Sequence, residues 1–352
     1  MTDFVAPNKI NFIENKIPHW ENVRHYLSIS ESVNHWTNFG PISEIVQDRF
    51  LELLGLSKDT FSGLLCSNCT VGLELIARLL EYKAQRKLKW LVSAFSFENL
   101  RIGYFHDATI VDCDPHGMLS FEELQKIPLE DYDGVVLTNI FGLVPDFREY
   151  SNFCKQMNKL VIVDNAAGLG NHQPHHFEIP FHAFSLHQTK PFGVGEGGLI
   201  VTPAGDKELL KNMMFFAKDR VERIEPYATN AKLSEISAAF LLDRFNRIPE
   251  WQVLYKAQYR RIMSVADQIG LAPLINREEN TIAMSNPFLS KNPVLISSLE
   301  NDILHLGKYY QPLGTGYTQA NQIFDHIINI PCHPDVAKID TKDLLNLMRR
   351  FV

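Results

Sequence analysis

The segment of the chain that decides the fold reads FHAFSLHQTKPFGVGEGGLIVT, from Phe181 to Thr202. Its two ends, residues 181–186 and 199–202, are apolar runs of the kind found in strands buried in a sheet. Between them lie Lys190 and a glycine-rich turn, and glycine lets a ligand approach the backbone closely. A lone lysine is usually a solvated surface charge, but this one stands between two apolar runs. The pattern predicts covalent chemistry at Lys190, most simply a Schiff base with an aldehyde cofactor.

Length and composition limit the class of protein. The 352 residues suit one large domain and a smaller one, and 45% hydrophobic with 21% charged residues is ordinary for a soluble enzyme. The net charge of −7 argues against binding to nucleic acid. No apolar run approaches the roughly 20 residues that span a bilayer, and Met1–Phe4 do not begin a signal peptide. We therefore expect a cytoplasmic protein with no membrane partner.

Strand-like and helical patterns alternate from about residue 60 to residue 245, which predicts an α/β domain with a largely parallel sheet. The predicted strands are 63–66, 90–94, 108–112, 134–138, 160–164, 182–186 and 197–202. The predicted helices are 71–82, 147–157, 206–216, 232–245 and the long amphipathic 248–269.

The chain is predicted to divide into three parts. Residues 1–45 pack on the main body, residues 46–245 form the large cofactor-binding α/β domain, and residues 246–352 form a small C-terminal α+β domain. For the small domain we expect a strand at 294–296, helices at 299–306 and 341–351, and a core that includes 327–331.

Three further segments place useful side chains at predicted strand ends, where open α/β sheets gather ligands. Thr70 lies at a strand-to-helix junction whose free N–H groups suit phosphate, although it could simply cap the helix. Asp164 ends a strongly apolar strand and needs a partner, either a protonated pyridine nitrogen or a helix terminus. Phe95 and Phe97 follow another strand, and one ring is placed either to stack on a cofactor or to pack in the core.

The order and the amino-acid sequences of these segments resemble those of the fold type I aminotransferases, specifically the DegT/DnrJ/EryC1/StrS family. Residues 185–190 with 195–198 match the lysine segment of that family, and 229–239 and 112–115 match two other motifs. The resemblance runs from Asn38 to the C-terminal helix. It implies a large, mostly parallel seven-stranded sheet flanked by helices, with a small C-terminal α+β domain.

The resemblance also implies pyridoxal 5′-phosphate as the cofactor and a homodimer with shared active sites. By it, Lys190 is the catalytic residue that links to the cofactor, Asp164 pairs with the pyridine nitrogen and Phe97 stacks on the ring. The phosphate is held by the remaining residues of this set, which are Thr70, Ser185, the backbone near Cys69, and Asn230 from the neighbouring subunit.

The reaction that the resemblance implies moves an amino group from glutamate to a keto-deoxysugar linked to a nucleoside diphosphate, with C-4 preferred over C-3. Lys190 carries the proton in both halves of the reaction. The product would serve amino-sugar synthesis for an O-antigen or another surface polysaccharide. The residues expected near the substrate are Asn38, Phe39, His187, Tyr309 and Tyr310. The alternative is a cofactor-binding fold type I protein with a regulatory or non-transaminase role.

The sequence departs from the family pattern at three positions. Cys69 stands where the phosphate turn of the family has glycine, Ala167 stands where a glutamine or histidine is frequent, and Asn165 is unusual beside the aspartate. These departures weaken the assignment of the substrate more than the assignment of the cofactor.

Two other patterns suggest different chemistry. Cys66 and Cys69 have the spacing of a redox pair, and the histidines at 172, 175, 176 and 182 could suggest a metal cluster. We expect neither redox chemistry nor a metal site, because the chain is far longer than a thioredoxin domain and the histidines lack ligand register.

Overall fold

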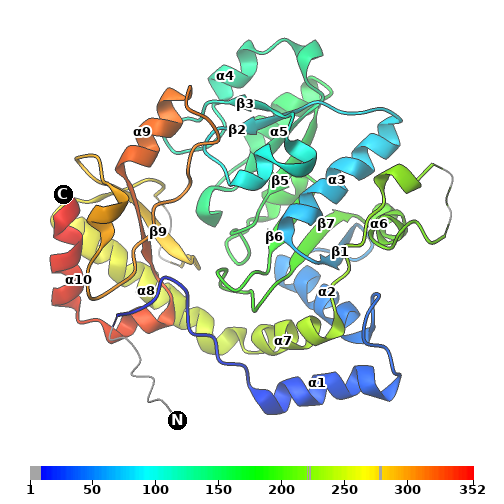
Figure 1. The fold of residues 1–352 in the computed structure, drawn as a ribbon, viewed down its shortest axis with the longest axis horizontal. Coiled ribbons are helices and arrows are strands. Elements are labelled where there is room, and N and C mark those ends of the chain that lie inside the picture. The colour runs from blue at the N-terminus through cyan, green and yellow to red at the C-terminus, as the bar shows by residue number, and fades with distance from the viewer. Residues whose placement is uncertain (1–8, 220, 222, 277–279) are drawn as a thin grey trace.

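The computed structural model describes residues 9–219, 221, 223–276 and 280–352. Its main element is a seven-stranded sheet with the strand order β1-β7-β6-β5-β4-β2-β3 (Figure 1). The strands are β1 (Phe61–Cys66), β2 (Trp90–Ser93), β3 (Thr109–Val111), β4 (Gly134–Thr138), β5 (Leu160–Asp164), β6 (His182–Ser185) and β7 (Gly198–Pro203). The pairs from β3 to β6 are parallel, and β7 runs antiparallel to both of its neighbours. The predicted seven-stranded, mostly parallel sheet is therefore confirmed.

Helices cover both faces of this sheet, which explains why its strands are continuously apolar. On one face, α3 packs against Ile162, Ala183 and Ile200, and on the other, α2 and α7 pack against Phe184 and Leu199. The helices of this part are α1 (Trp20–Ser32), α2 (Pro41–Leu54), α3 (Cys69–Ala84), α4 (Phe121–Lys126), α5 (Arg148–Gln156), α6 (Lys207–Met214) and α7 (Glu235–Asn246).

A second, three-stranded antiparallel sheet forms the core of the C-terminal part, with the order β10-β9-β8. The long helix α8 leads to it from α7 (Figure 1). The elements here are α8 (Ile248–Ile269), β8 (Ala272–Pro273), β9 (Ser285–Leu289), α9 (Thr318–His326), β10 (Ile327–Pro331) and α10 (Thr341–Met348). Of the helices in the described residues, none is both long and apolar enough to cross a bilayer.

Two predictions for the C-terminal part are wrong. Residues 294–296 are not a strand: Val294 donates to the Asp325 carbonyl, and Leu295 and Ile296 are each 69% exposed. Residues 299–306 are not an α-helix, although their leucines have helical spacing. The Asn301 side chain accepts hydrogen bonds from the N–H groups of Ile303 and Leu304 at 2.9 and 2.8 Å. This local bonding replaces the helical pattern of hydrogen bonds.

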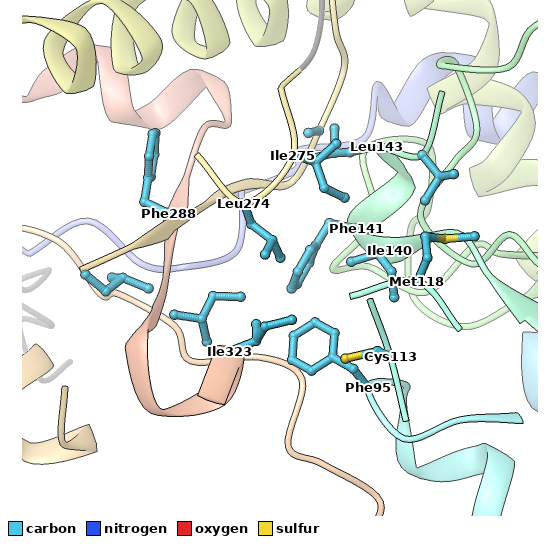
Figure 2. Close-up of a cluster of buried hydrophobic side chains, with 14 of the residues drawn as sticks. Phe95, Cys113, Met118, Ile140, Phe141, Leu143, Leu274, Ile275, Phe288 and Ile323 are labelled. Carbon is cyan, nitrogen blue, oxygen red and sulfur yellow. The ribbon is translucent and has the colours of Figure 1, made fainter. Parts of the chain in front are cut away.

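One continuous hydrophobic cluster joins the two sheets (Figure 2). Phe95, Ile140 and Phe141 enter it from segments that follow strands of the large sheet, and Phe288 and Ile323 enter it from β9 and α9. The C-terminal part is therefore held against the large sheet by a shared core. The proposed boundaries at residues 45/46 and 245/246 stay predictions, and residues 1–8 lie outside the described residues.

Candidate active site

The strand register brings the predicted residues to one edge of the large sheet. Gly198, at the start of β7, is paired with Cys66 at the end of β1 and with Ser185 at the end of β6. Beyond Ser185, Asp164 ends β5 and is paired with Ala183. The loop that carries Lys190 begins at this edge and returns to it at β7. The carboxyl ends of β1, β5 and β6 therefore surround Lys190, as expected for a ligand site in an open α/β sheet.

Lys190 and Asp164 lie within electrostatic range of each other at the bottom of this site. Asp164 is 2% exposed, and the amino group of Lys190 is buried although the residue as a whole is half-buried. Burial lowers the pKa of Lys190 below 10.5, and the Asp164 charge opposes this only in part. Burial also raises the pKa of Asp164, against hydrogen bonds from the Ala166 N–H and the Asn99 side chain. At a given pH the site thus holds a larger neutral fraction of the amine than an exposed lysine has, and the neutral amine is the nucleophilic form.

The start of α3 forms a cradle suited to phosphate. Asn68 caps the helix by accepting a hydrogen bond from Val71 N–H at 2.9 Å, and the helix begins with Cys69 and Thr70. A Cβ added to Gly198 would lie 2.5 Å from the Asn68 carbonyl carbon, so the turn packs directly on β7 because residue 198 is glycine. The N–H groups of Cys69 and Thr70 have no acceptor among the described residues, and they lie at the positive end of the helix dipole.

Ser185 and Asn230 differ in their position relative to this cradle. Ser185 is 9% exposed, and its hydroxyl accepts a hydrogen bond from His187 N–H at 3.3 Å. Asn230 lies on the exposed surface, where its amide oxygen accepts a hydrogen bond from Lys232. A second copy of the chain could therefore reach the Asn230 side chain.

An aromatic wall lines the site. Phe97 is 55% exposed, and its ring meets Tyr310 edge-to-face at a centroid distance of 6.4 Å. Tyr310 in turn stacks on Phe141 at 4.7 Å, and burial, with the Asp164 charge second, raises its pKa. An exposed ring that packs against Tyr310 is of the kind that can cover a flat ligand.

The other residues predicted near a substrate divide into two groups: His187 and Tyr309 lie near the loop that carries Lys190, and Asn38 and Phe39 lie before α2. His187 Nδ1 is 3.0 Å from Thr189 Oγ1, and Tyr309 is 43% exposed against Phe12. Asn38 and Phe39 both have φ of 61° just before α2. Phe39 packs against the cluster under α3, with Lys211 over its ring, and no contact between it and Lys190 is seen among the described residues.

The cysteines and histidines form no second reactive centre in the part of the chain that the structure describes. Cys66 and Cys69 are free and buried, and burial raises the pKa of both thiols, that of Cys66 to about 12. Among the described residues, no group of three or more His, Cys, Asp or Glu side chains could hold a metal ion. His182 Nε2 is 2.7 Å from the Ile179 carbonyl, so this histidine is bonded within the core.

The two departures beside Asp164 are both buried. Asn165 is fully buried, and its amide oxygen accepts a hydrogen bond from Asn139 at 2.7 Å. Ala167 is 6% exposed, and its carbonyl is so close to Gly142 that a Cβ added there would lie 2.1 Å away. Neither residue supplies a side-chain donor to the site.

Four residues around Lys190 were missed by sequence reasoning. Met284 Sδ is 3.6 Å from Lys190 Nζ. Asn99 lies near enough to Asp164 to oppose the rise of its pKa, and the buried amide oxygen of Asn99 lacks a partner among the described residues. Lys16 and Arg244 hold the backbone of the lysine loop. Burial, followed by the charge of Arg244, lowers the pKa of Lys16 to about 7. No motif marks these residues, because they come from distant parts of the chain.

These residues fit a pyridoxal phosphate group. The buried amine of Lys190 has a thioether rather than an oxygen as its neighbour, and Asp164 is a buried carboxylate that needs a cation. Thr70, Ser185 and the free N–H groups of α3 provide anion donors on the β1 side of the pair. The site therefore offers four features that suit the cofactor: an amine, a buried carboxylate, donors for the phosphate and an exposed aromatic ring.

Comparisons with known proteins identify a family and a shared fold. The model of the DegT/DnrJ/EryC1/StrS aminotransferase family matches residues 21–349. Protein MT3510 of Mycobacterium tuberculosis is 34% identical over 237 residues, covering 59% of this chain and 56% of that protein. The chain therefore spans little more than half the length of this curated relative.

Two full-length matches are more distant. The dTDP-4-amino-4,6-dideoxy-D-glucose transaminase of Shigella dysenteriae is 21% identical over 369 aligned positions, covering 95% of this chain and 97% of that protein. The structure of Helicobacter pylori PseC, an aminotransferase involved in the biosynthesis of pseudoaminic acid, superposes with a TM-score of 0.81 at 17% identity. It covers 97% of this chain and 99% of that chain, and shows that the fold is shared.

Proposed function

Because this chain belongs to the DegT/DnrJ/EryC1/StrS aminotransferase family, we propose that it is a pyridoxal-phosphate-dependent sugar aminotransferase. The amino donor is glutamate, and the acceptor is a keto-deoxysugar linked to a nucleoside diphosphate, aminated at C-4 in preference to C-3. The product is an amino sugar for an O-antigen or another surface polysaccharide. The observation that carries this proposal is the buried amine of Lys190 within electrostatic range of the buried Asp164 carboxylate.

Lys190 and Asp164 would divide the chemistry between them. When bound, pyridoxal phosphate supplies a cationic ring that accepts the electron pair of a breaking C–H bond. Asp164 keeps the ring nitrogen protonated, because its buried carboxylate is stabilised by a cation. Lys190 is the nucleophile that holds the cofactor, and its amine moves the proton between two carbons that it can reach. The lowered pKa of Lys190 keeps part of the amine unprotonated for both tasks.

The remaining residues would bind and orient. Thr70, Ser185 and the backbone near Cys69 hold the phosphate, and Phe97 covers the ring face. The exposure of Asn230 supports a homodimer in which a second copy supplies this side chain to the phosphate.

The residues that contact the substrate are proposed from their positions alone. His187 and Tyr309 lie at the rim of the site, Tyr310 lies in its wall, and Asn38 and Phe39 lie before α2. The transaminase from Shigella dysenteriae supports C-4, because its name describes a 4-amino sugar carried on dTDP.

Borohydride reduction of the purified protein tests the cofactor. The protein should be yellow, and reduction should fix the cofactor on the peptide that contains Lys190, as read by mass spectrometry. Lys190→Ala should lose the label, while Lys308→Ala, which changes another lysine of lowered pKa, should keep it. A colourless wild-type protein that takes up no cofactor would contradict the proposal.

The reaction is tested separately from cofactor binding. Glutamate should convert the bound cofactor to its amine form, and a panel of keto-sugar nucleotides should return it in a single turnover. The mass of each product identifies the sugar and the carbon that is aminated. A protein that binds the cofactor and turns over no member of the panel would favour a regulatory role.

A further inference from the structure

A second lysine, Lys16, forms hydrogen bonds with the backbone of the loop that carries Lys190. Lys16 Nζ donates hydrogen bonds to the carbonyls of Gln188 at 2.8 Å, Gly193 at 2.7 Å and Lys190 itself. These three oxygens converge on one nitrogen, although Lys16 lies more than 170 positions earlier in the chain. In its protonated form Lys16 has three donors, so one side chain satisfies all three carbonyls. The carbonyl of Lys190 is thereby fixed at the point from which its side chain extends.

A second cationic side chain, that of Arg244, holds Pro191, which lies between Lys190 and Gly193 in the loop. Arg244, on α7, donates to the Pro191 carbonyl from two nitrogens at 2.9 and 2.8 Å. Its guanidinium also pairs with Glu14 at 2.7 Å, and both side chains are at most 10% exposed. Tyr255 donates a third bond to Glu14 at 2.9 Å. The segment that carries Lys16 is therefore anchored two residues earlier, which holds Lys16 in place.

This segment, residues 9–19, runs from the C-terminal part to α1, which lies beside α7 (Figure 1). It is tied to the C-terminal part at Ile10 and Asn15, and to α7 at His19. It also forms one wall of a cavity of about 810 Å³, whose other walls include Gln188 and Gly195 of the lysine loop and Tyr309. The matched family region begins at residue 21, so Lys16 lies outside it.

We propose that Lys16 is a positioning residue for Lys190, fixing the backbone of residues 188–193 so that the reactive amine points at the edge of the sheet. The inference rests on the proposed function for the identity of the reaction, but the clamp itself is a property of the protein without cofactor. Removal of Lys16 leaves three inward-facing carbonyls without their shared donor, and the loop gains freedom.

The first experiment compares Lys16→Met with Lys338→Met in the full-length apoprotein. Both residues are lysines that line the same cavity, but Lys338 is 67% exposed and pairs with Asp335. Hydrogen exchange read by mass spectrometry should be at least roughly tenfold faster over residues 187–195 in Lys16→Met only. Unchanged exchange in Lys16→Met would overturn the clamp.

The second experiment reads positioning in the loaded enzyme. Lys16→Met should lower kcat by about 10-fold to 100-fold with little change in KM for glutamate, because misplacing a reactive group slows the chemical step. Lys16→Cys treated with 2-bromoethylamine restores an ammonium at nearly the same reach and should recover most of kcat. The five native cysteines are all buried, and wild type treated alike is the control.

The outcomes separate this inference from the proposed function. If exchange rises but kcat falls no more than in Lys338→Met, Lys16 is structural and positioning is wrong. If kcat falls and aminoethylation does not restore it, positioning by the ammonium is also wrong. If wild type shows neither cofactor uptake nor transamination, the proposed function fails, and positioning for that reaction falls with it even where exchange still shows the clamp.

Discussion

The edge of the large sheet and the segment of residues 9–19 both reach Lys190, but they contact different parts of it. The sheet edge acts on the side chain: Asp164 lies within electrostatic range of the amine, and burial lowers the pKa of Lys190. The N-terminal segment acts on the backbone, through Lys16 and the carbonyls of the loop. The comparison separates the residues that set the reactivity of the amine from those that set its direction.

The largest effect is expected at the sheet edge, from Asp164→Asn. An amide of the same shape cannot carry the charge that balances a protonated ring, so transamination should slow by about 10²-fold to 10³-fold. Single-turnover conversion of the cofactor by glutamate measures this effect. Asp206→Asn is the matched control, because Asp206 is also buried, beyond the far end of β7, and pairs with Lys83. A rate for Asp164→Asn close to that of the control would break the comparison.

The next effect is a pH dependence of Lys190. Only the free amine attacks an aldehyde, so uptake of pyridoxal phosphate by apoprotein should quicken about tenfold per pH unit below the lowered pKa. The rate should level off below pH 10.5, whereas Nα-acetyl-lysine levels off near its ordinary value. Stopped-flow absorbance measures both curves, and coincident midpoints would show that burial does not activate Lys190.

The same shift affects stability with a defined sign. Between the lowered pKa and 10.5 the unfolded chain holds a proton on Lys190 that the folded chain has lost. The unfolding free energy of the apoprotein therefore rises with pH across that window. Lys190→Met should flatten this part of the profile in denaturant titrations.

The smallest effect is expected at the cysteines. The double variant Cys66→Ala with Cys69→Ala should keep activity within roughly threefold of wild type, because buried thiols of raised pKa are poor nucleophiles. Steady-state rates per mole of bound cofactor measure this. Loss of all turnover, with the cofactor still bound, would instead support redox chemistry at this pair.

The sequence predicted the large sheet better than the C-terminal part for a physical reason. Strands β4 and β5 were predicted with their observed bounds, because each is an apolar run buried on both faces. Strand β9 was not predicted, since Asn286 and Pro287 are unusual in strands. Its pairing with β10 comes from residues about 40 positions later in the chain, which no local pattern reveals.

The same contrast holds in the site. Lys190, Asp164, Ser185 and Thr70 stand at strand ends or at a helix start, which a sequence pattern indicates. The roles of these four residues in cofactor binding and catalysis are proposed from the family resemblance. Lys16 was not predictable, because its partners are backbone carbonyls and carry no sequence signature.

The antiparallel direction of β7 has a consequence for how such a protein can change over evolution. Because β6 and β7 are neighbours of opposite direction, the chain from Ser185 to Gly198 leaves and re-enters the sheet at the same edge. Residues can be inserted beside Gly195, where the surrounding space is open, without rerouting a crossover, although the φ of 73° at Gly195 favours glycine at that position itself. The loop beside the cavity can therefore change in sequence and length during evolution, while strands β6 and β7, which position Lys190, stay the same.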